Sequence, residues 1–326
     1  MYYLKYRPAT IDEIDNEAIR ASIQNLFQAD TIPHALMLTG QKGTGKTSIA
    51  RIIARHVNEL AADESIAQSS DIVEMDAASN RGIDEVKSLI REASFLPMSG
   101  KYRVFIIDEC HMITNDAFNA LLKTLEEPPE TTLFILATTN IEKVPKTIVS
   151  RCSIIQFARA KNDDIIHMLK RIAKGEKLTL PDDLYELIAT HADGSFRDAA
   201  KLMEDLVIQQ ATTAEQARKY LGVAGEQTFL SVLEKGDVKT TLQWFKDFVE
   251  QGANVKPFLE DVLQQLRLAL LTKSGVEGVN VPTTLTSSQL SRLIKLMSEA
   301  YLGLKSTPIE SIPVEIAIVD FYNEKK

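Results

Sequence analysis

One loop of this sequence has residues of the type and spacing that hold phosphate groups in proteins. It matches the pattern GxxxxGK followed by Ser or Thr and comprises, with the serine after it, Gly40, Gln41, Lys42, Gly43, Thr44, Gly45, Lys46, Thr47 and Ser48. Glycines allow backbone N–H groups to turn toward phosphates, and the following helix directs its positive end at them. In this pattern Lys46 supplies charge for the β- and γ-phosphates, and the Thr47 hydroxyl binds Mg²⁺. The loop therefore predicts binding of ATP and Mg²⁺ rather than a plain glycine-rich turn.

An apolar run at residues 104–107 ends in two acidic residues, Asp108 and Glu109. A strand in an open parallel sheet delivers such side chains to the edge where ligands bind. There Asp108 can hold Mg²⁺ through water, and Glu109 can orient and deprotonate an attacking water. Taken alone, the run is more typical of a strand end that meets solvent. Its place about sixty residues after the glycine-rich loop favours ATP hydrolysis instead.

A second apolar run, residues 133–137, ends in Thr138, Thr139 and Asn140. The local alternative is a strand followed by a turn that a hydroxyl stabilises. In a sheet that carries both phosphate-site elements, we expect one of the two hydroxyls to contact the γ-phosphate or its water. Arg151 and Arg197 are further candidates, because phosphoryl transfer needs cations that stabilise the developing charge. Taken alone, each arginine is more typical of an exposed surface.

A scaffold of alternating strands and helices is expected to position these residues. Apolar runs predict strands over 34–39, 72–75, 103–107, 132–137 and 153–157. Apolar residues at helical spacing predict helices over 16–29, 47–59, 84–94 and 115–125. Such alternation is typical of a parallel sheet that helices cover on both faces.

The chain changes character after residue 157, where strand signals stop. Helices are predicted over 163–173, 182–190 and 195–208. The helical pattern then continues, with breaks at Gly236, Gly252, 275–282 and Pro308. We therefore predict an α/β nucleotide-binding domain over 1–157, a helical lid over 158–223 and an all-helical domain over 224–326.

Composition and charge exclude several classes of protein. The net charge of −8 argues against a protein that coats nucleic acid non-specifically, but it does not exclude a local basic surface. The two cysteines, Cys110 and Cys152, form no CxxC pair, so we expect neither a zinc site nor a disulfide framework. No apolar run reaches the roughly eighteen residues that cross a bilayer, and the N-terminus has no signal-peptide stretch. A cytoplasmic location without membrane contact is expected.

Together, these residues resemble the AAA+ ATPases of the clamp-loader group and, within it, the gamma/tau family of bacterial DNA polymerase III. The matching segments are Tyr6-Arg-Pro, HALMLTGQKGTGKTS, EMDAASNRGIDEV, VFIIDECHM, FNALLKTLEEPPE, FILATTN, VPKTIVSRC and GSFRDA. They run in the family's order up to Asp198, whereas the remaining chain matches only in length and helical character. The resemblance implies an AAA+ α/β domain, a helical lid and an all-α collar that joins subunits.

The resemblance also implies roles for individual residues. Arg151 would be an arginine finger that acts in trans on the ATP of a neighbouring subunit, and Arg197 would be the sensor-2 arginine of the lid. Thr139 would be sensor 1, with Thr138 as the alternative. Near the adenine would lie Tyr6, Arg7 and Pro8. The residues implied for contact with the DNA backbone are Asn80, Arg81 and Lys87, although Lys87 fits a solvated helix start nearly as well.

The same resemblance implies partners and a task. Gamma/tau copies assemble with delta and delta prime subunits, as part of a DNA polymerase holoenzyme, into a spiral that opens a ring-shaped sliding clamp. The spiral places the clamp on primer–template DNA at replication forks in the nucleoid, and ATP hydrolysis releases it. Family members often carry a cysteine-rich zinc module after the helix of the phosphate loop. Residues 60–70 are short and free of cysteine here, so zinc is not expected. The chain ends near the expected end of the collar, without the longer tau extension.

Three other proteins share parts of this pattern. A replication factor C small subunit is the nearest alternative, but EMDAASNRGID and DECHM favour the bacterial family. A Holliday-junction branch-migration motor is another ring ATPase, and the SRC and LLKTLEEPP strings favour the clamp loader over it. A structural subunit such as delta prime would have a degraded phosphate loop. Lys46, Thr47, Asp108 and Glu109 argue against that alternative.

Overall fold

The computed structural model describes residues 1–29, 31–61, 69–80, 82–221, 226–250, 252, 254–276 and 281–323. The chain divides into two compact units, Met1–Gln210 and Ala211–Lys326. This division keeps the expected lid helices up to residue 208 with the α/β part, and it falls before the expected boundary at residue 223; the three-domain scheme stays a prediction. Most of the cysteine-free segment (62–68) and Arg81 lie outside the described residues.

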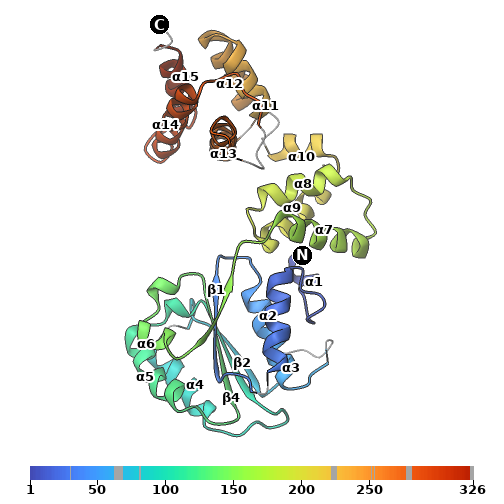
Figure 1. The fold of residues 1–326 in the computed structure, drawn as a ribbon, viewed down its shortest axis with the longest axis vertical. Coiled ribbons are helices and arrows are strands. Elements are labelled where there is room, and N and C mark those ends of the chain that lie inside the picture. Colours follow the sequence, from blue (N-terminus) through green and yellow to red (C-terminus); the bar gives the residue numbers. More distant parts are fainter. Residues whose placement is uncertain are drawn as a thin grey trace. The chain divides into compact units, whose positions relative to one another are not determined.

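Among the described residues of the first unit, five strands form one parallel sheet in the order β2-β3-β4-β1-β5 (Figure 1). The strands are β1 (Ala35–Gly40), β2 (Ile72–Asp76), β3 (Arg103–Asp108), β4 (Thr132–Thr138) and β5 (Ser153–Phe157). The central strands β3 and β4 are almost wholly apolar and buried, as expected of parallel strands covered on both faces. The predicted strands are thereby confirmed.

Helices pack on both faces of the sheet because successive strand residues point to opposite sides. Along β1, Leu36 and Leu38 join the core on one face, whereas Ala35 and Met37 join the core on the other. The first face is covered by α2 (Glu17–Gln28) and α3 (Lys46–Val57), and the second by α4 (Ile83–Ala93), α5 (Asn115–Glu126) and the short α6 (Lys146–Val149) (Figure 1). The predicted α/β fold is confirmed.

Three helices complete the first unit: α7 (Asn162–Glu176), α8 (Asp182–His191) and α9 (Phe196–Ile208). Their predicted starts hold, since Pro181 precedes α8 and the Ser195 hydroxyl caps α9 by accepting from the Asp198 N–H at 3.2 Å. Among the described residues, the structure adds four short elements that the sequence did not predict, namely α6, α1 (Tyr2–Lys5), η2 (Cys110–Met112) and η3 (Ile141–Lys143). Of these, α1 contacts α9.

Every secondary-structure element that the structure describes in the second unit is a helix. Its helices are α10 (Ala214–Leu221), α11 (Glu226–Lys235), α12 (Val238–Glu250), α13 (Val255–Lys273), α14 (Ser287–Gly303) and α15 (Ile312–Asn323). The predicted breaks at Gly236, Gly252 and Pro308 fall between these helices. Its mainly aliphatic core includes several phenylalanines, and the single tryptophan, Trp244, packs against this core and stacks on Phe248 with 5.2 Å between ring centroids. No helix in the described ranges is long and apolar enough to cross a membrane.

A buried carboxylate fixes the loop that leads into β3. Asp71 is fully buried and accepts hydrogen bonds from the backbone N–H groups of Met98, Ser99 and Gly100 at 2.6, 2.7 and 2.8 Å. The Ser99 hydroxyl donates a further bond at 3.1 Å. Burial raises the pKa of Asp71, but these hydrogen bonds outweigh it, so the pKa lies below its ordinary value. The anchor sets where β3, the strand that carries Asp108, begins.

Replacing Asp71 by Asn should destabilise the first unit, because the amide NH₂ would face N–H donors and leave some of them unsatisfied. We expect a loss of about 2 kcal/mol in the free energy of unfolding. Since the folded pKa is depressed, the carboxylate contributes above its unfolded pKa of about 3.9 and the contribution disappears as the pH falls through the folded value. The difference between the two proteins should therefore shrink in acid.

Urea unfolding followed by circular dichroism measures this loss. The fluorescence transition of Trp244, in the second unit, serves as an internal control and should not shift. An unchanged dichroism midpoint near neutral pH would show that Asp71 is no anchor.

Candidate nucleotide site

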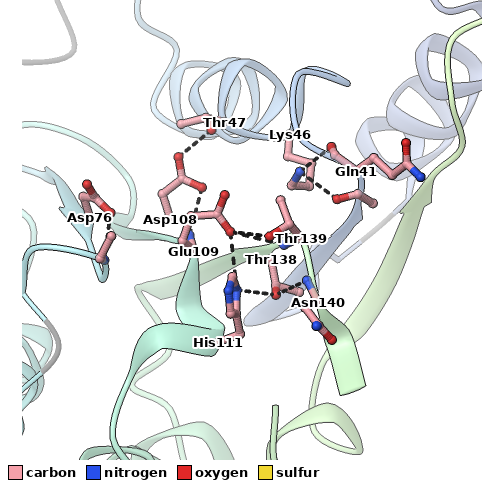
Figure 2. A network of polar contacts seen from close by, with 12 residues as sticks. Gln41, Lys46, Thr47, Asp76, Asp108, Glu109, His111, Thr138, Thr139 and Asn140 are labelled. Carbon is pink, nitrogen blue, oxygen red and sulfur yellow. Dashed lines mark hydrogen bonds and ion pairs between the residues drawn. The ribbon is translucent and has the colours of Figure 1, made fainter. Parts of the chain in front are cut away.

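Six of the side chains selected from the sequence gather at one edge of the sheet, namely Lys46, Thr47, Asp108, Glu109, Thr138 and Thr139 (Figure 2). β4 lies between β1 and β3, and all three run parallel. The register pairs Thr39 with Thr138 and Ile107 with Leu136, so the three strands end at the same level. Segments that are about thirty to sixty residues apart in sequence therefore converge on one site, at the strand ends where open α/β sheets bind ligands.

The glycine-rich loop encloses the ammonium group of Lys46. Gly43 and Gly45 have φ angles of +81° and +99°, which side chains with a Cβ rarely adopt. The Lys46 side chain is buried, and its Nζ donates to the carbonyl oxygens of Gly40 and Gln41 at 2.8 Å each. Burial lowers the pKa of Lys46, and the nearby carboxylates of Glu109 and Asp108 act against this effect. The loop thus holds a buried cation where a phosphate is expected.

Two side chains that could bind a metal ion through oxygen face each other: Thr47 of α3 and Asp108 of β3. The Thr47 hydroxyl donates to Asp108 Oδ2 at 2.6 Å, and Asp108 Oδ1 accepts from the Glu109 N–H at 3.0 Å. Hydroxyl and carboxylate oxygens are the ligands that Mg²⁺ takes in nucleotide sites. The pair therefore fits the predicted magnesium ion by its chemistry and its closeness.

Glu109 has a strained backbone conformation, and a threonine just after β4 holds its carboxylate. Its φ is +48°, in the left-handed region that non-glycine residues seldom occupy. Its Oε2 accepts from the Thr139 hydroxyl at 2.8 Å and from the Thr139 N–H at 3.3 Å. Such strain persists where surrounding contacts fix it, and it is common at functional sites. Thr139 thus contacts the predicted base directly.

Thr138 has a different setting, together with a histidine that the sequence analysis missed. The Thr138 side chain is fully buried, and its Oγ1 accepts from the Asn140 N–H at 3.0 Å. His111 Nδ1 lies 3.1 Å from Thr138 Oγ1 and 3.4 Å from Glu109 Oε2 (Figure 2). The sequence signal for His111 was its place two residues after Glu109 in DECHM. Only the turn η2 brings the His111 ring back to the Glu109 carboxylate.

The cavity above the loop is lined by residues from the N-terminus, the sheet edge and the helices α7 and α9. Of the predicted residues, it includes Tyr6, Arg7, Pro8, Lys42, Gly43, Thr44, Gly45, Lys46, Thr47, Ser48, Asp108, Glu109 and Arg197. Arg7 Nε donates to the Ser48 hydroxyl at 2.8 Å, and burial lowers the pKa of Arg7 to about 10, which leaves it cationic at neutral pH. The Phe196 N–H donates to the Gly43 carbonyl at 3.1 Å, so the start of α9 touches the loop.

Other predicted residues do not line this cavity. Arg151 follows α6; its Nη1 donates to the Thr147 carbonyl at 2.6 Å, and its guanidinium pairs with Glu126 of α5. Asn80 lies in the turn after β2, where its N–H donates to the Asp76 carbonyl at 2.9 Å. Lys87 is exposed on α4. The trans and DNA-contacting roles of these residues stay predictions.

Comparisons with known proteins agree with this geometry. A family model described as DNA polymerase III, delta subunit, matches residues 15–161. DNA polymerase III subunit tau of Bacillus subtilis (strain 168) is 34% identical over 97% of this chain and 62% of its own length. DNA polymerase III subunit gamma of Buchnera aphidicola subsp. Baizongia pistaciae is 31% identical over 98% of this chain and 95% of its own length. The Thermotoga maritima RuvB Holliday junction branch migration motor has a similar fold, with a TM-score of 0.54 and 19% identity over 78% of this chain and 91% of its own.

The fold and the geometry of the loop and strands define an α/β protein of the P-loop class, and the expected α/β fold is confirmed. The identity to gamma and tau subunits over nearly the whole chain is more specific: the chain belongs to the gamma/tau family of DNA polymerase III. It spans 62% of the length of the Bacillus subtilis relative and 50% of the gamma/tau subunit of Mycoplasma genitalium (strain ATCC 33530 / DSM 19775 / NCTC 10195 / G37).

The two threonines allow a matched pair of substitutions, because Thr→Val keeps the shape and removes only the hydroxyl. Thr139→Val should lower the turnover of ATP by about tenfold or more, since it frees the Glu109 carboxylate from its 2.8 Å partner. It should change the melting temperature little, because Thr139 is half-buried.

Thr138→Val should lower the melting temperature instead, since it leaves the Asn140 N–H without its acceptor. Steady-state hydrolysis and thermal melting of both variants test this; the opposite pattern would make Thr138 the sensing residue.

Proposed function

We propose that this chain is an ATP-hydrolysing subunit of a clamp loader, which opens a sliding clamp and places it on primer–template DNA during replication. The observation that supports this best is the pairing of Thr47 with Asp108 and of Thr139 with Glu109 at one sheet edge. It occurs in a chain that shares 31% identity with a DNA polymerase III gamma subunit over 95% of that protein. The site would work in the cytoplasm, at replication forks.

Each residue of the site has a part in the proposed hydrolysis. The triphosphate lies in the loop 40–47, with the Lys46 ammonium beside its β- and γ-phosphates. Thr47 and Asp108 would hold Mg²⁺, which neutralises phosphate charge when bound. Glu109 orients the attacking water and accepts its proton, and Thr139 holds the Glu109 carboxylate in place. Arg197, on the lid side of the cavity, binds the γ-phosphate.

A second cation is expected from a neighbouring copy. Arg151 lies outside the cavity that its own chain forms, and about a third of its side chain is exposed. Its charge would serve a neighbour's γ-phosphate in an assembly of gamma/tau copies with delta and delta prime subunits. Asn80, Arg81 and Lys87 would contact the DNA backbone from inside that assembly.

A non-hydrolysing subunit is the alternative, since the matching family model is described as a delta subunit. Such a subunit would need no complete hydrolytic set. The geometry favours hydrolysis, because Lys46 is enclosed by the loop and both acids at the end of β3 have threonine partners. The likeness to RuvB concerns the fold alone.

The proposal predicts that DNA and clamp together stimulate hydrolysis. The chain is reconstituted with delta and delta prime subunits, and phosphate release is measured without additions, with primed DNA, with clamp and with both. We expect the rate to rise several-fold only when both are present. An assembly that carries Lys46→Ala provides the background. A rate indifferent to both ligands would refute clamp loading, and the absence of hydrolysis under every condition would favour the delta-type alternative.

Arg151→Ala separates binding from hydrolysis. The isolated variant should bind ATP as the unmodified chain does, because Arg151 lies outside its own cavity. Hydrolysis by the assembly should fall by about 10²-fold, the usual cost of removing a charge that stabilises the transition state. Arg20→Ala is a matched control, since the Arg20 side chain is 32% exposed against 31% for Arg151. Weakened ATP binding by the isolated variant would place Arg151 in cis.

A further inference from the structure

The N-terminal helix α1 is fastened to two helices of the lid. The Tyr2 N–H donates to Glu204 of α9 at 3.0 Å. Glu176, at the end of α7, accepts from the Lys5 ammonium at 2.7 Å and from the Tyr6 hydroxyl at 2.8 Å. Burial raises the pKa of Tyr6, and its bond to Glu176 raises it further. These contacts fix α1 beside α9 at the mouth of the nucleotide cavity, which Tyr2, Tyr3 and Tyr6 line.

Two cations of α9 lie against the ring of Tyr3. Arg197 Cζ is 5.6 Å from the ring centroid, and Lys201 Nζ is 5.4 Å from it. Both distances are within the range of a cation–π interaction. Positions 197, 201 and 204 recur at helical spacing, so one face of α9 meets α1. The Tyr3 ring, carried by α1, therefore lies within cation–π range of both cations.

The charge of Arg197 acts inside the cavity. Burial is the main cause of the lowered pKa of Lys46, and the positive charge of Arg197 contributes to it. Arg197 likewise adds to the lowered pKa of Arg7, for which burial is again the main cause. The guanidinium held at Tyr3 is thus close enough to the phosphate loop to influence its cations.

We propose that Tyr3 is a positioning residue for nucleotide binding: its ring holds the Arg197 guanidinium at the mouth of the cavity, ready for the γ-phosphate of ATP. This inference rests on the proposed function, in which Arg197 binds that phosphate. An arginine on a helix surface has many rotamers, and binding a phosphate would restrict them. A ring that restricts them beforehand reduces the entropy lost on binding. Tyr3 would therefore favour ATP over ADP through its contact with Arg197.

Tyr3→Leu and Tyr3→Phe test this inference in the full chain. Leucine removes the ring, whereas phenylalanine keeps the face that the cations contact. Dissociation constants for ATP and for ADP are measured by calorimetry. In Tyr3→Leu we expect ATP to bind about threefold to tenfold more weakly and ADP to bind as before. Tyr3→Phe should retain the original preference. A role of Tyr3 confined to folding would weaken the binding of ATP and of ADP equally. That result, or tighter ATP binding in Tyr3→Leu, would overturn the inference.

Arg197→Ala, alone and combined with Tyr3→Leu, tests the role of Tyr3 separately from the proposed role of Arg197 in binding the γ-phosphate. Arg197→Ala should lower the preference for ATP, and adding Tyr3→Leu should lower it no further, because the ring acts through the guanidinium. If Arg197→Ala leaves the preference unchanged, the proposed role of Arg197 fails and the inference fails with it. If Arg197→Ala lowers the preference but Tyr3→Leu does not, only the role of Tyr3 is refuted. Lys201→Ala is the matched control and should leave the preference intact.

Discussion

The whole site depends on the parallel register of three strands. β4 pairs with β1 on one side and with β3 on the other, so that the loop after β1, the acids after β3 and the threonines after β4 meet. Since neighbouring strand residues point to opposite faces, a slip of one residue along β4 would exchange the settings of its threonines. The register therefore decides that Thr139 meets Glu109 while Thr138 is buried beside His111.

Contacts outside the sheet fix the segments that enter this edge. Asp71 holds the loop before β3, and the Phe196 N–H of α9 meets the Gly43 carbonyl of the phosphate loop. Helix α9 is in turn joined to α1 through Glu204. Buried or partly buried hydrogen bonds of this kind are costly to break without replacement. The phosphate loop is thus joined directly to α9 and, through α9, to α1.

Local patterns predicted most of the fold and the chemical centre of the site. Strands, helices, the phosphate loop and the acids after β3 all have signals within a short window of sequence. The strand order had none, because the pairing of β1 with β4 joins residues about a hundred positions apart. Nor did α1, whose four residues are too few for a periodic pattern and depend on distant partners such as Glu204 and Glu176. Asp71 and His111 were missed for the same reason: their partners lie elsewhere in the chain.

The distribution of charge suits a polyanion. The chain carries a net charge of −8, yet Lys46, Arg7 and Arg197 line one cavity. Burial lowers the pKa of both Lys46 and Arg7, and Arg197 adds to each shift, so folding holds these cations where their charge is unfavourable. A triphosphate would offset the cost of burying these positive charges, because it supplies the opposite charge in a place from which water is partly excluded. Asp108 and Glu109 line the same cavity, where the proposed metal ion and attacking water would be needed. In the proposed hydrolysis, positive charge would draw the nucleotide in, and the carboxylates would act on it once it is bound.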